Sequence, residues 1–129
     1  MRWALADADA TPQDVDYVNA HGTSTPMNDR SESAAMHAVF GADVGRVSVS
    51  STKSAMGHLI AAAGAVEAAV CALSIHHGVL PVNANYANPD PDCMLNLVVG
   101  AARKQPVRVA LSNSFGFGGT NAALVFGRV

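Results

Sequence analysis

The chain has 129 residues, half of them hydrophobic, which suits a single domain or one half of a larger α/β unit with a sizeable core. Its 8 Lys and Arg residues stand against 10 Asp and Glu residues without a basic block, and aromatic residues make up only 5%, so the composition argues against nucleic-acid binding. No apolar run reaches the ~20 residues of a membrane span. No secretory pattern begins the sequence, and two cysteines make no disulfide framework. Together these features indicate a cytoplasmic protein.

Helices and strands are expected to alternate in the first half of the chain. In order, the sequence predicts a helix end at 1–10, a strand at 14–20, a helix from Asn28 or Asp29 to Phe40, and a strand at 46–50. The helix end should make its apolar contacts through Leu5 and Trp3 or Ala4. Met36, Val39 and Phe40 fall on one side of the second helix, and Gly41 is expected to end it.

The second half carries the strongest helix signal, from His58 to His77. This segment is apolar nearly all round, so we expect it to be buried, with Gly78 ending it. The remaining elements are predicted as a loop at 79–91, a short strand at 94–99, a turn at 103–106, and two antiparallel strands at 107–111 and 122–126.

Two histidine-containing loops follow the first two predicted strands. One is Asn19 to Pro26, around His21, and the other is Ser51 to His58. Open α/β sheets place their chemistry in loops at the carboxyl ends of strands, so we expect one site assembled from both loops. A single histidine in such a loop is more often a hydrogen-bonded core residue, and only the pair favours a site.

His58 is expected to stand at the start of the long helix, where the helix dipole disfavours a charged imidazole. A neutral histidine can donate an N–H to a developing oxyanion, as in the general case of triosephosphate isomerase. Lys53 adds positive charge nearby. Glu67, inside the helix, needs a partner if buried, and Lys53 is the candidate, although a purely structural ion pair fits the same residues.

A glycine-rich stretch from Phe115 to Gly119 allows the backbone to pass close to a ligand, and its free N–H groups suit an oxyanion hole. A tight hairpin with aromatic packing explains it equally well. Asn121 stands where a third glycine of a dinucleotide motif would be, which argues against that motif.

Neither cysteine is predicted to be a nucleophile. Cys71 lies inside the apolar helix, and Cys93 has no positive neighbour to lower its thiol pKa. His37, His76 and His77 are interpreted as surface or capping residues, and no spacing of His and Cys indicates a metal site.

Three ordered motifs resemble the elongating β-ketoacyl–acyl-carrier-protein synthases: residues 15–26, 51–58 and 113–121. Residues 62–67 and 88–90 fit as well, whereas Ala55-Met56 and Pro81-Val82 depart from the common pattern. The likeness covers the whole chain but only the C-terminal half of such an enzyme. It implies an α/β fold, the C-terminal half of a thiolase-like fold, with a mixed five-stranded sheet covered by helices and one domain at 1–129.

The resemblance also implies a reaction, the decarboxylative Claisen condensation of malonyl carrier protein with an acyl thioester in fatty-acid or polyketide synthesis. It assigns stabilisation of the malonyl enolate to His21 and His58, and ordering of the His58 loop to Lys53 and Glu67. For Thr23 and Thr25 the resemblance implies contact with the phosphopantetheine arm. For Phe117 and Gly118 it implies the acyl gate and the oxyanion hole. No cofactor is implied beyond the phosphopantetheine of the acyl carrier protein.

The nucleophilic Cys of this family lies in the N-terminal half, which this sequence does not contain. We therefore expect a chain that is inactive alone and whose partners are the missing N-terminal synthase half, acyl carrier protein and, in the complete enzyme, a second copy as a homodimer. One alternative is a non-catalytic protein, either a partner resembling a chain-length factor or a truncated remnant. Another is a thioesterase that uses Ser24 with His21. Acyl chain length is not predicted.

Overall fold

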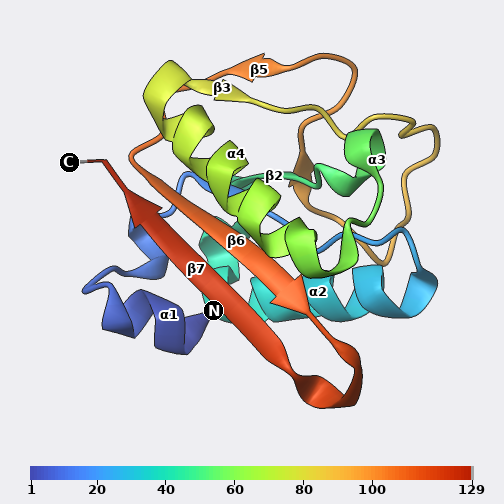
Figure 1. The fold of residues 1–129 in the computed structure, drawn as a ribbon, viewed down its shortest axis with the longest axis horizontal. Helices are drawn as coiled ribbons and strands as arrows, with labels where there is room; N and C mark the ends of the chain where they lie inside the picture. The colour runs from blue at the N-terminus through green and yellow to red at the C-terminus, as the bar shows by residue number, and fades with distance from the viewer. Residues whose placement is uncertain (129) are drawn as a thin grey trace.

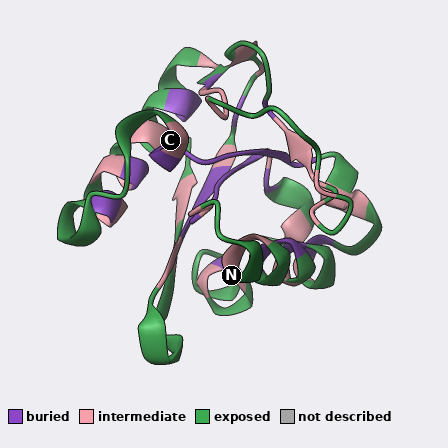
Figure 2. Cartoon of the chain, turned by 90° about the vertical axis from the view of Figure 1, so that its right-hand side faces the viewer, coloured by how far each residue is buried: buried purple, intermediate pink, exposed green. Residues whose placement is uncertain are grey.

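The computed structural model describes residues 1–128, which form a sheet with helices on both faces (Figures 1 and 2). The helices are α1 (Arg2–Asp7), α2 (Pro26–Phe40), α3 (Lys53–Met56) and α4 (Ala63–His77). The strands are β1 (Tyr17–Asn19), β2 (Ser48–Ser50), β3 (Val79–Leu80), β4 (Asn96–Leu97), β5 (Arg103–Lys104), β6 (Val109–Phe115) and β7 (Asn121–Gly127). Short 3-10 turns lie at Pro12–Asp14, Gly41–Gly45, Ile60–Ala62 and Phe117–Gly119.

The main sheet has five strands in the order β4-β2-β1-β6-β7. β1 pairs in parallel with β2 and β6, β2 pairs in parallel with β4, and β7 is antiparallel to β6. β3 and β5 form a separate antiparallel pair. The predicted mixed five-stranded sheet covered by helices is therefore confirmed.

Two hydrophobic clusters lie on the two faces of this sheet. Successive side chains of a strand point to opposite faces, and in β1 Tyr17 packs in the cluster of α4 whereas Val18 packs in the cluster of α2. On the α2 side the buried Met36 and Phe40 contribute, as predicted. Because both faces are covered, the parallel strands are buried. Because these strands run in the same direction, their carboxyl ends lie at the same end of the sheet.

Several predicted boundaries are wrong by a few residues, each for a local reason. The strand at 14–20 is shorter, because Pro12–Asp14 forms a 3-10 turn in which Thr11 and Asp14 cap each other. α2 begins at Pro26 rather than near Asn28 or Asp29, since proline has the φ of a first helical residue. Residues 103–106 are not only a turn, because β5 pairs with β3.

At the N-terminal helix, Leu5 is buried as predicted. Trp3 is 93% exposed. The expectation that it packs against other apolar residues is therefore wrong, as far as residues 1–128 show. Leu5 reaches the cluster on the α2 side of the sheet.

The helix predicted from His58 to His77 begins later, at Ala63, after a 3-10 turn, and Gly78 ends it in the left-handed conformation as predicted. All-round burial is wrong. One side is buried, through Glu67, Cys71, Ser74 and Ile75, and the helices in Figure 2 carry both buried and exposed stretches. In α4 Leu73 is 54% exposed, and in the preceding 3-10 turn Ile60 is 76% exposed.

By length and composition alone, Ile60–His77 is apolar enough to cross a membrane, with a mean hydropathy of 1.4 over 18 residues. At 18 residues the segment does not reach the ~20 of a full span, so the expectation that no apolar run reaches that length is not contradicted. The observation is weak evidence for a membrane span, because a helix that packs in a protein core passes the same test, and α4 packs on β6 and β1.

Candidate active site

The two histidine loops lie side by side because β1 and β2 are parallel neighbours. Their contact depends on Gly22, which has φ +43°, and a Cβ on this residue would lie 2.5 Å from the Cβ of Ser51. The Ser51 hydroxyl donates to the Gly22 carbonyl oxygen at 3.1 Å. Only a glycine lets the first loop press so closely on the second.

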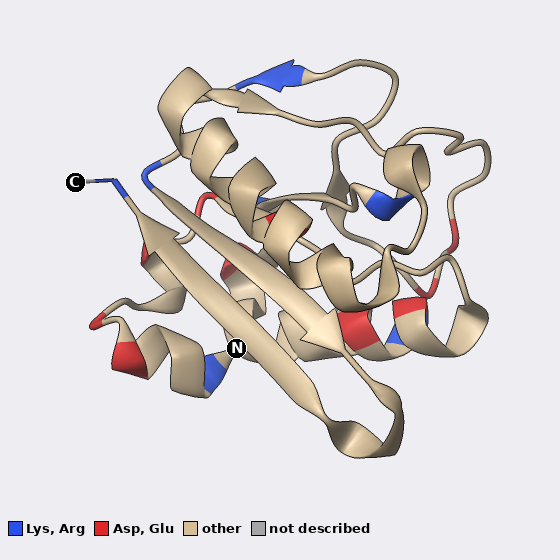
Figure 3. Cartoon of the chain, viewed as in Figure 1, with Lys and Arg blue, Asp and Glu red and all other residues tan. Residues whose placement is uncertain are grey.

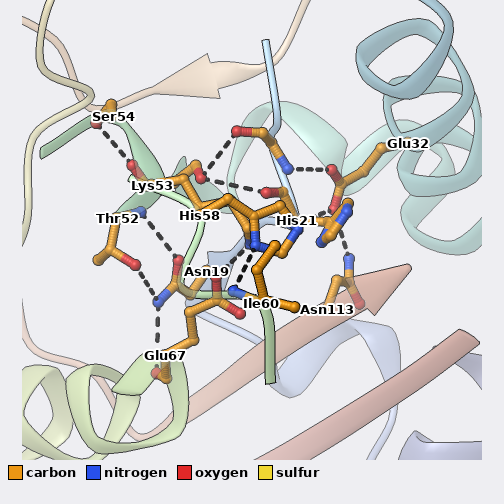
Figure 4. A network of polar contacts seen from close by, with 12 residues as sticks. Asn19, His21, Glu32, Thr52, Lys53, Ser54, His58, Ile60, Glu67 and Asn113 are labelled. Atoms are coloured by element: carbon orange, nitrogen blue, oxygen red, sulfur yellow. Dashed lines mark hydrogen bonds and ion pairs between the residues drawn. The ribbon is translucent and has the colours of Figure 1, made fainter. Parts of the chain in front are cut away.

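This contact brings His21 and His58 together, with ring centroids 5.5 Å apart and the rings edge to face (Figure 4). His21 is buried, and the ring of Phe115 lies 5.7 Å from it on the other side. Burial lowers the pKa of His21 to about 4, helped by the positive charge of Lys53 and by His58. His21 is therefore neutral at pH 7.

The proton of His58 is placed by the backbone of Ile60, whose N–H donates to Nδ1 of His58 at 3.1 Å (Figure 4). A neutral imidazole that accepts at Nδ1 carries its proton on Nε2 and donates there. Ile60 has φ +52°, a conformation that is strained for a β-branched residue. Strain of this kind, about 1–3 kcal/mol, collects at functional sites.

The predicted position of His58 at the start of a helix is wrong, since α4 begins at Ala63. The helix dipole is strongest within the first turn of a helix, and His58 lies outside it. The dipole argument concerned the charge of His58, whereas the Ile60 N–H determines which of its ring nitrogens accepts a hydrogen bond. No pattern in the sequence signals this contact, because it depends on one backbone angle.

The predicted ion pair between Lys53 and Glu67 is confirmed, and both side chains are almost fully buried. Asn19, at the end of β1, connects the elements that carry them. Its side chain accepts the Thr52 N–H at 3.4 Å and donates to the Glu67 carbonyl oxygen at 3.4 Å (Figure 4). The strand, the Lys53 loop and α4 are thereby held as one unit.

Glu32 is a site residue that the sequence interpretation missed. Its carboxylate accepts the backbone N–H groups of His21 and Gly22, both at 2.9 Å, and the side-chain amide of Asn113 at 3.1 Å. It therefore joins α2, the His21 loop and β6. Burial raises the pKa of Glu32, although these hydrogen bonds oppose the shift. An available signal was that Glu32 shares the buried side of α2 with Met36.

A cleft of about 740 Å³ opens beside the histidine loops. Thr23, Lys53 and His58 line one wall, and residues 83–88 contribute another part of the lining. The hydroxyls of Thr23 and Thr25 lie 3.1 Å apart. Within the described part of the chain, no group of His, Cys, Asp and Glu side chains is arranged to hold a metal.

Phe117 and Gly118 lie outside the lining of this cleft, at the tip of the β6–β7 hairpin. Phe117 is fully exposed, and Gly118 has φ +74°. Both cysteines have raised thiol pKa values because of burial, that of Cys71 to about 12, although Cys93 lines the cleft. What the cleft offers is a hydrogen-bond donor at His58 beside a neutral His21, which suits an oxygen that gains negative charge.

Comparison with known proteins shows the family of this chain. Residues 1–87 match the family model described as the β-ketoacyl synthase C-terminal domain. The chain is 51% identical over its whole length to "Nodulation protein E" of Rhizobium sp. (strain N33), of which it covers 32%. It is 52% identical over 128 residues to "3-oxoacyl-[acyl-carrier-protein] synthase 2" of Rhizobium meliloti (strain 1021), of which it covers 30%.

Solved structures give the same result. The chain superposes on "The ishigamide ketosynthase/chain length factor" with a TM-score of 0.95 and 40% identity, over 99% of this chain and 31% of that one. A β-ketoacyl synthase from Burkholderia phymatum STM815 gives a TM-score of 0.94 and 39% identity, over 100% of this chain and 31% of that one. The chain thus spans about a third of the length of the proteins it matches.

Proposed function

Because this chain belongs to the β-ketoacyl synthase family, as its C-terminal domain, we propose that it supplies the His/His/Lys half of a condensing active site. The reaction joins malonyl carrier protein to an acyl thioester in fatty-acid or polyketide synthesis. The observation that carries the proposal is the pair of neutral His21 and Nε2-protonated His58, 5.5 Å apart beside an open cleft.

In the proposed reaction the malonyl group loses CO₂, and the electron pair of the broken C–C bond forms an enolate. Its oxygen, which gains the negative charge, accepts hydrogen bonds from His21 and His58. The enolate carbon then attacks the acyl thioester carbonyl and a C–C bond forms. The thiolate of the nucleophilic Cys, which belongs to the N-terminal part of the synthase, leaves. His21 is suited to this role because a low pKa keeps it neutral at pH 7, and a neutral imidazole can donate an N–H to an oxygen that gains negative charge.

The other roles follow from position. The Lys53–Glu67 pair holds the start of the second loop, through α3, against α4. Thr23 lines the cleft with its hydroxyl beside that of Thr25, which suits the amides of a phosphopantetheine arm. Phe117 and Gly118 are proposed to gate the acyl pocket and contribute a backbone N–H to the oxyanion hole, from a hairpin tip that other parts of the enzyme would meet.

A complete site requires the remaining two thirds of the synthase. The exposed outer side of α4, with Leu73 and the adjoining Ile60, is the surface that we propose the N-terminal half covers. The chain alone is then inactive. The assembled enzyme is proposed to be a cytoplasmic homodimer that receives its substrates from acyl carrier protein.

The competing proposal is a non-catalytic partner, or a remnant. Ketosynthases in complex with a chain length factor are among the structural neighbours, with 34% identity to one chain of the complex from Xenorhabdus doucetiae. The presence of His21, His58 and Lys53 in one connected site favours the catalytic proposal, because a passive partner needs none of them.

The test is to mix this chain with the separately produced remaining two thirds of a synthase, which carry the family's Cys, add acyl and malonyl carrier proteins, and follow products by intact-mass spectrometry. We expect condensed product only in the mixture, and none when the chain carries His58→Ala. His37→Ala is the matched control, an exposed histidine on α2 and away from the exposed side of α4. An active mixture that is insensitive to His58→Ala, or an acyl mass on Cys71 or Cys93, contradicts the proposal.

A further inference from the structure

Asn83 lies in the segment that connects β3 to β4, where it is half-buried and lines the cleft. Its side-chain amide reaches the carboxyl end of β2, just before the second histidine loop. The oxygen Oδ1 accepts the Ser51 N–H at 2.9 Å. The nitrogen Nδ2 donates to the carbonyl oxygens of Val49 and Val98, each at 3.2 Å. Asn83 therefore uses both the acceptor and the two N–H donors of its amide.

This amide takes the place of one backbone hydrogen bond of the sheet. β2 and β4 are parallel, and just after β4 the Val98 N–H donates to the Val49 carbonyl oxygen at 2.9 Å. In a regular parallel ladder the next bond would join the Ser51 N–H to the Val98 carbonyl oxygen. The Asn83 amide stands between these two groups instead, accepting from the first and donating to the second. The two strands therefore separate where the second histidine loop begins.

Ser51 connects this amide to both histidine loops. It is the first residue of the second loop, and its hydroxyl donates to the Gly22 carbonyl oxygen of the first loop at 3.1 Å. The segment that carries the amide also holds the second loop beyond Lys53, because the Ala84 N–H donates to the Ser54 hydroxyl oxygen at 2.9 Å. The loop is thus fixed on both sides of Lys53 by the segment between β3 and β4.

We propose that Asn83 is a positioning residue of the site: its amide holds the second histidine loop at the distance from the first at which His21 and His58 meet. Asn83 acts through Ser51, whose N–H has no other hydrogen-bond partner within residues 1–128. A carboxylate at position 83 would place an oxygen against two carbonyl oxygens, and an aliphatic side chain would leave the Ser51 N–H unpaired. The effect on condensation rests on the proposed function, whereas the effect on the two loops is measured on this chain alone.

The test is an NMR titration of the His21 ring in Asn83→Leu, which keeps a side chain of similar size and removes its three hydrogen bonds. Burial and the positive charge of Lys53 hold the pKa of His21 at about 4. A displaced loop exposes His21 and moves Lys53 away, so the midpoint should rise from about 4 toward 6.5. Residues 79–89 contain no charged side chain (Figure 3), so no charge moves with the segment itself. Nuclear Overhauser contacts between His21 and His58 should weaken in the same variant.

Two controls separate positioning from loss of stability. Asn88→Leu makes the same substitution at an exposed position of the same segment. Val107→Ala removes buried apolar contacts in the α4-side cluster and is destabilising. Both should leave the His21 midpoint near 4.

If Asn83→Leu does not fold, Ser51→Ala tests the same connection, because it removes the hydroxyl that holds Gly22. It should raise the His21 midpoint as well. A folded Asn83→Leu that titrates near 4 overturns the proposal, as does an equal rise in Val107→Ala, or a midpoint near 4 in Ser51→Ala when Asn83→Leu is unfolded.

The consequence for catalysis is measured in the mixture with the remaining two thirds of a synthase. Condensation by Asn83→Leu should fall about 100-fold, as expected when reacting groups are misplaced by about 1 Å. If the unmodified mixture is inactive, the proposed function fails, while the His21 titration still decides whether Asn83 positions the loops. An active mixture in which Asn83→Leu raises the His21 midpoint but leaves the rate unchanged shows that the loop distance does not matter for condensation, and overturns the role of Asn83 in the reaction.

Discussion

The backbone N–H of Ile60 donates to Nδ1 of His58, and Ile60 reaches this position only in a left-handed conformation, at φ +52°. One strained residue thus determines which nitrogen of the neighbouring imidazole accepts and which one carries the proton and can donate. The Ile60 side chain itself is 76% exposed and contributes little to the hydrophobic core. The strained conformation therefore orients His58 and does not bury the Ile60 side chain.

Ile60→Gly should stabilise the fold. The left-handed conformation costs a β-branched residue about 1–3 kcal/mol, while glycine loses about 0.5–1 kcal/mol more conformational entropy than alanine. We expect a net gain of about 1 kcal/mol in the free energy of unfolding in urea. Since the N–H remains, ¹⁵N chemical shifts should still show the His58 proton on Nε2.

The control for this variant is Ala65→Gly, at an exposed position in the first turn of α4, where φ is helical and glycine should cost about 1 kcal/mol relative to alanine. A loss of stability for Ile60→Gly as large as for Ala65→Gly would show that Ile60 is not strained.

Gly22→Ala should separate the two histidine loops. Its Cβ would lie 2.5 Å from Cβ and 2.8 Å from Oγ of Ser51, at a φ that alanine disfavours. We expect a loss of about 3 kcal/mol in the free energy of unfolding, together with loss of the nuclear Overhauser contacts between His21 and His58. Gly45→Ala is the control, because its Cβ meets nothing within 4 Å and its φ is not left-handed.

The sequence predicts the sheet, the helices and the two loops because local patterns determine them. The His21–His58 pairing follows from loops at the ends of parallel strands, and the Lys53–Glu67 pair from the cost of a buried carboxylate. The role of Glu32 depends on which side of α2 faces the His21 loop, and the Ile60 contact depends on one backbone angle. The Ile60 contact leaves no pattern in composition or spacing, and the spacing of Glu32 and Met36 indicates only that the two residues share one side of α2. The exposure of α4 was missed because an apolar helix does not reveal which element covers it.

Glu67→Gln should be strongly destabilising, because it leaves the Lys53 ammonium buried without a negative partner. Breaking a buried pair from one side typically costs about 3–5 kcal/mol, measured here by urea unfolding. The double variant Lys53→Met with Glu67→Gln removes the charge as well, and should recover a large part of the loss. A Glu67→Gln variant as stable as the unmodified chain would show that the pair contributes nothing to folding.

The low pKa of His21 predicts a pH dependence of stability. Its pKa is about 4 when folded and 6.5 when unfolded, so between these values the unfolded chain binds more protons. The contribution of His21 to stability is therefore present above pH 6.5 and is lost as the pH falls toward 4. Burial raises the pKa of Glu32, and its contribution runs the other way, since it is lost as the pH rises through that raised pKa.

His21→Gln isolates the histidine from these other groups. The difference in unfolding free energy between the unmodified chain and His21→Gln should increase steadily from pH 4 to 6.5 and then level off. Measuring urea midpoints at half-unit intervals of pH gives this curve, and an NMR titration of the His21 ring should show a midpoint near 4. A difference that is flat over this range would mean that His21 titrates like an exposed histidine, and its neutrality at the site would need another cause.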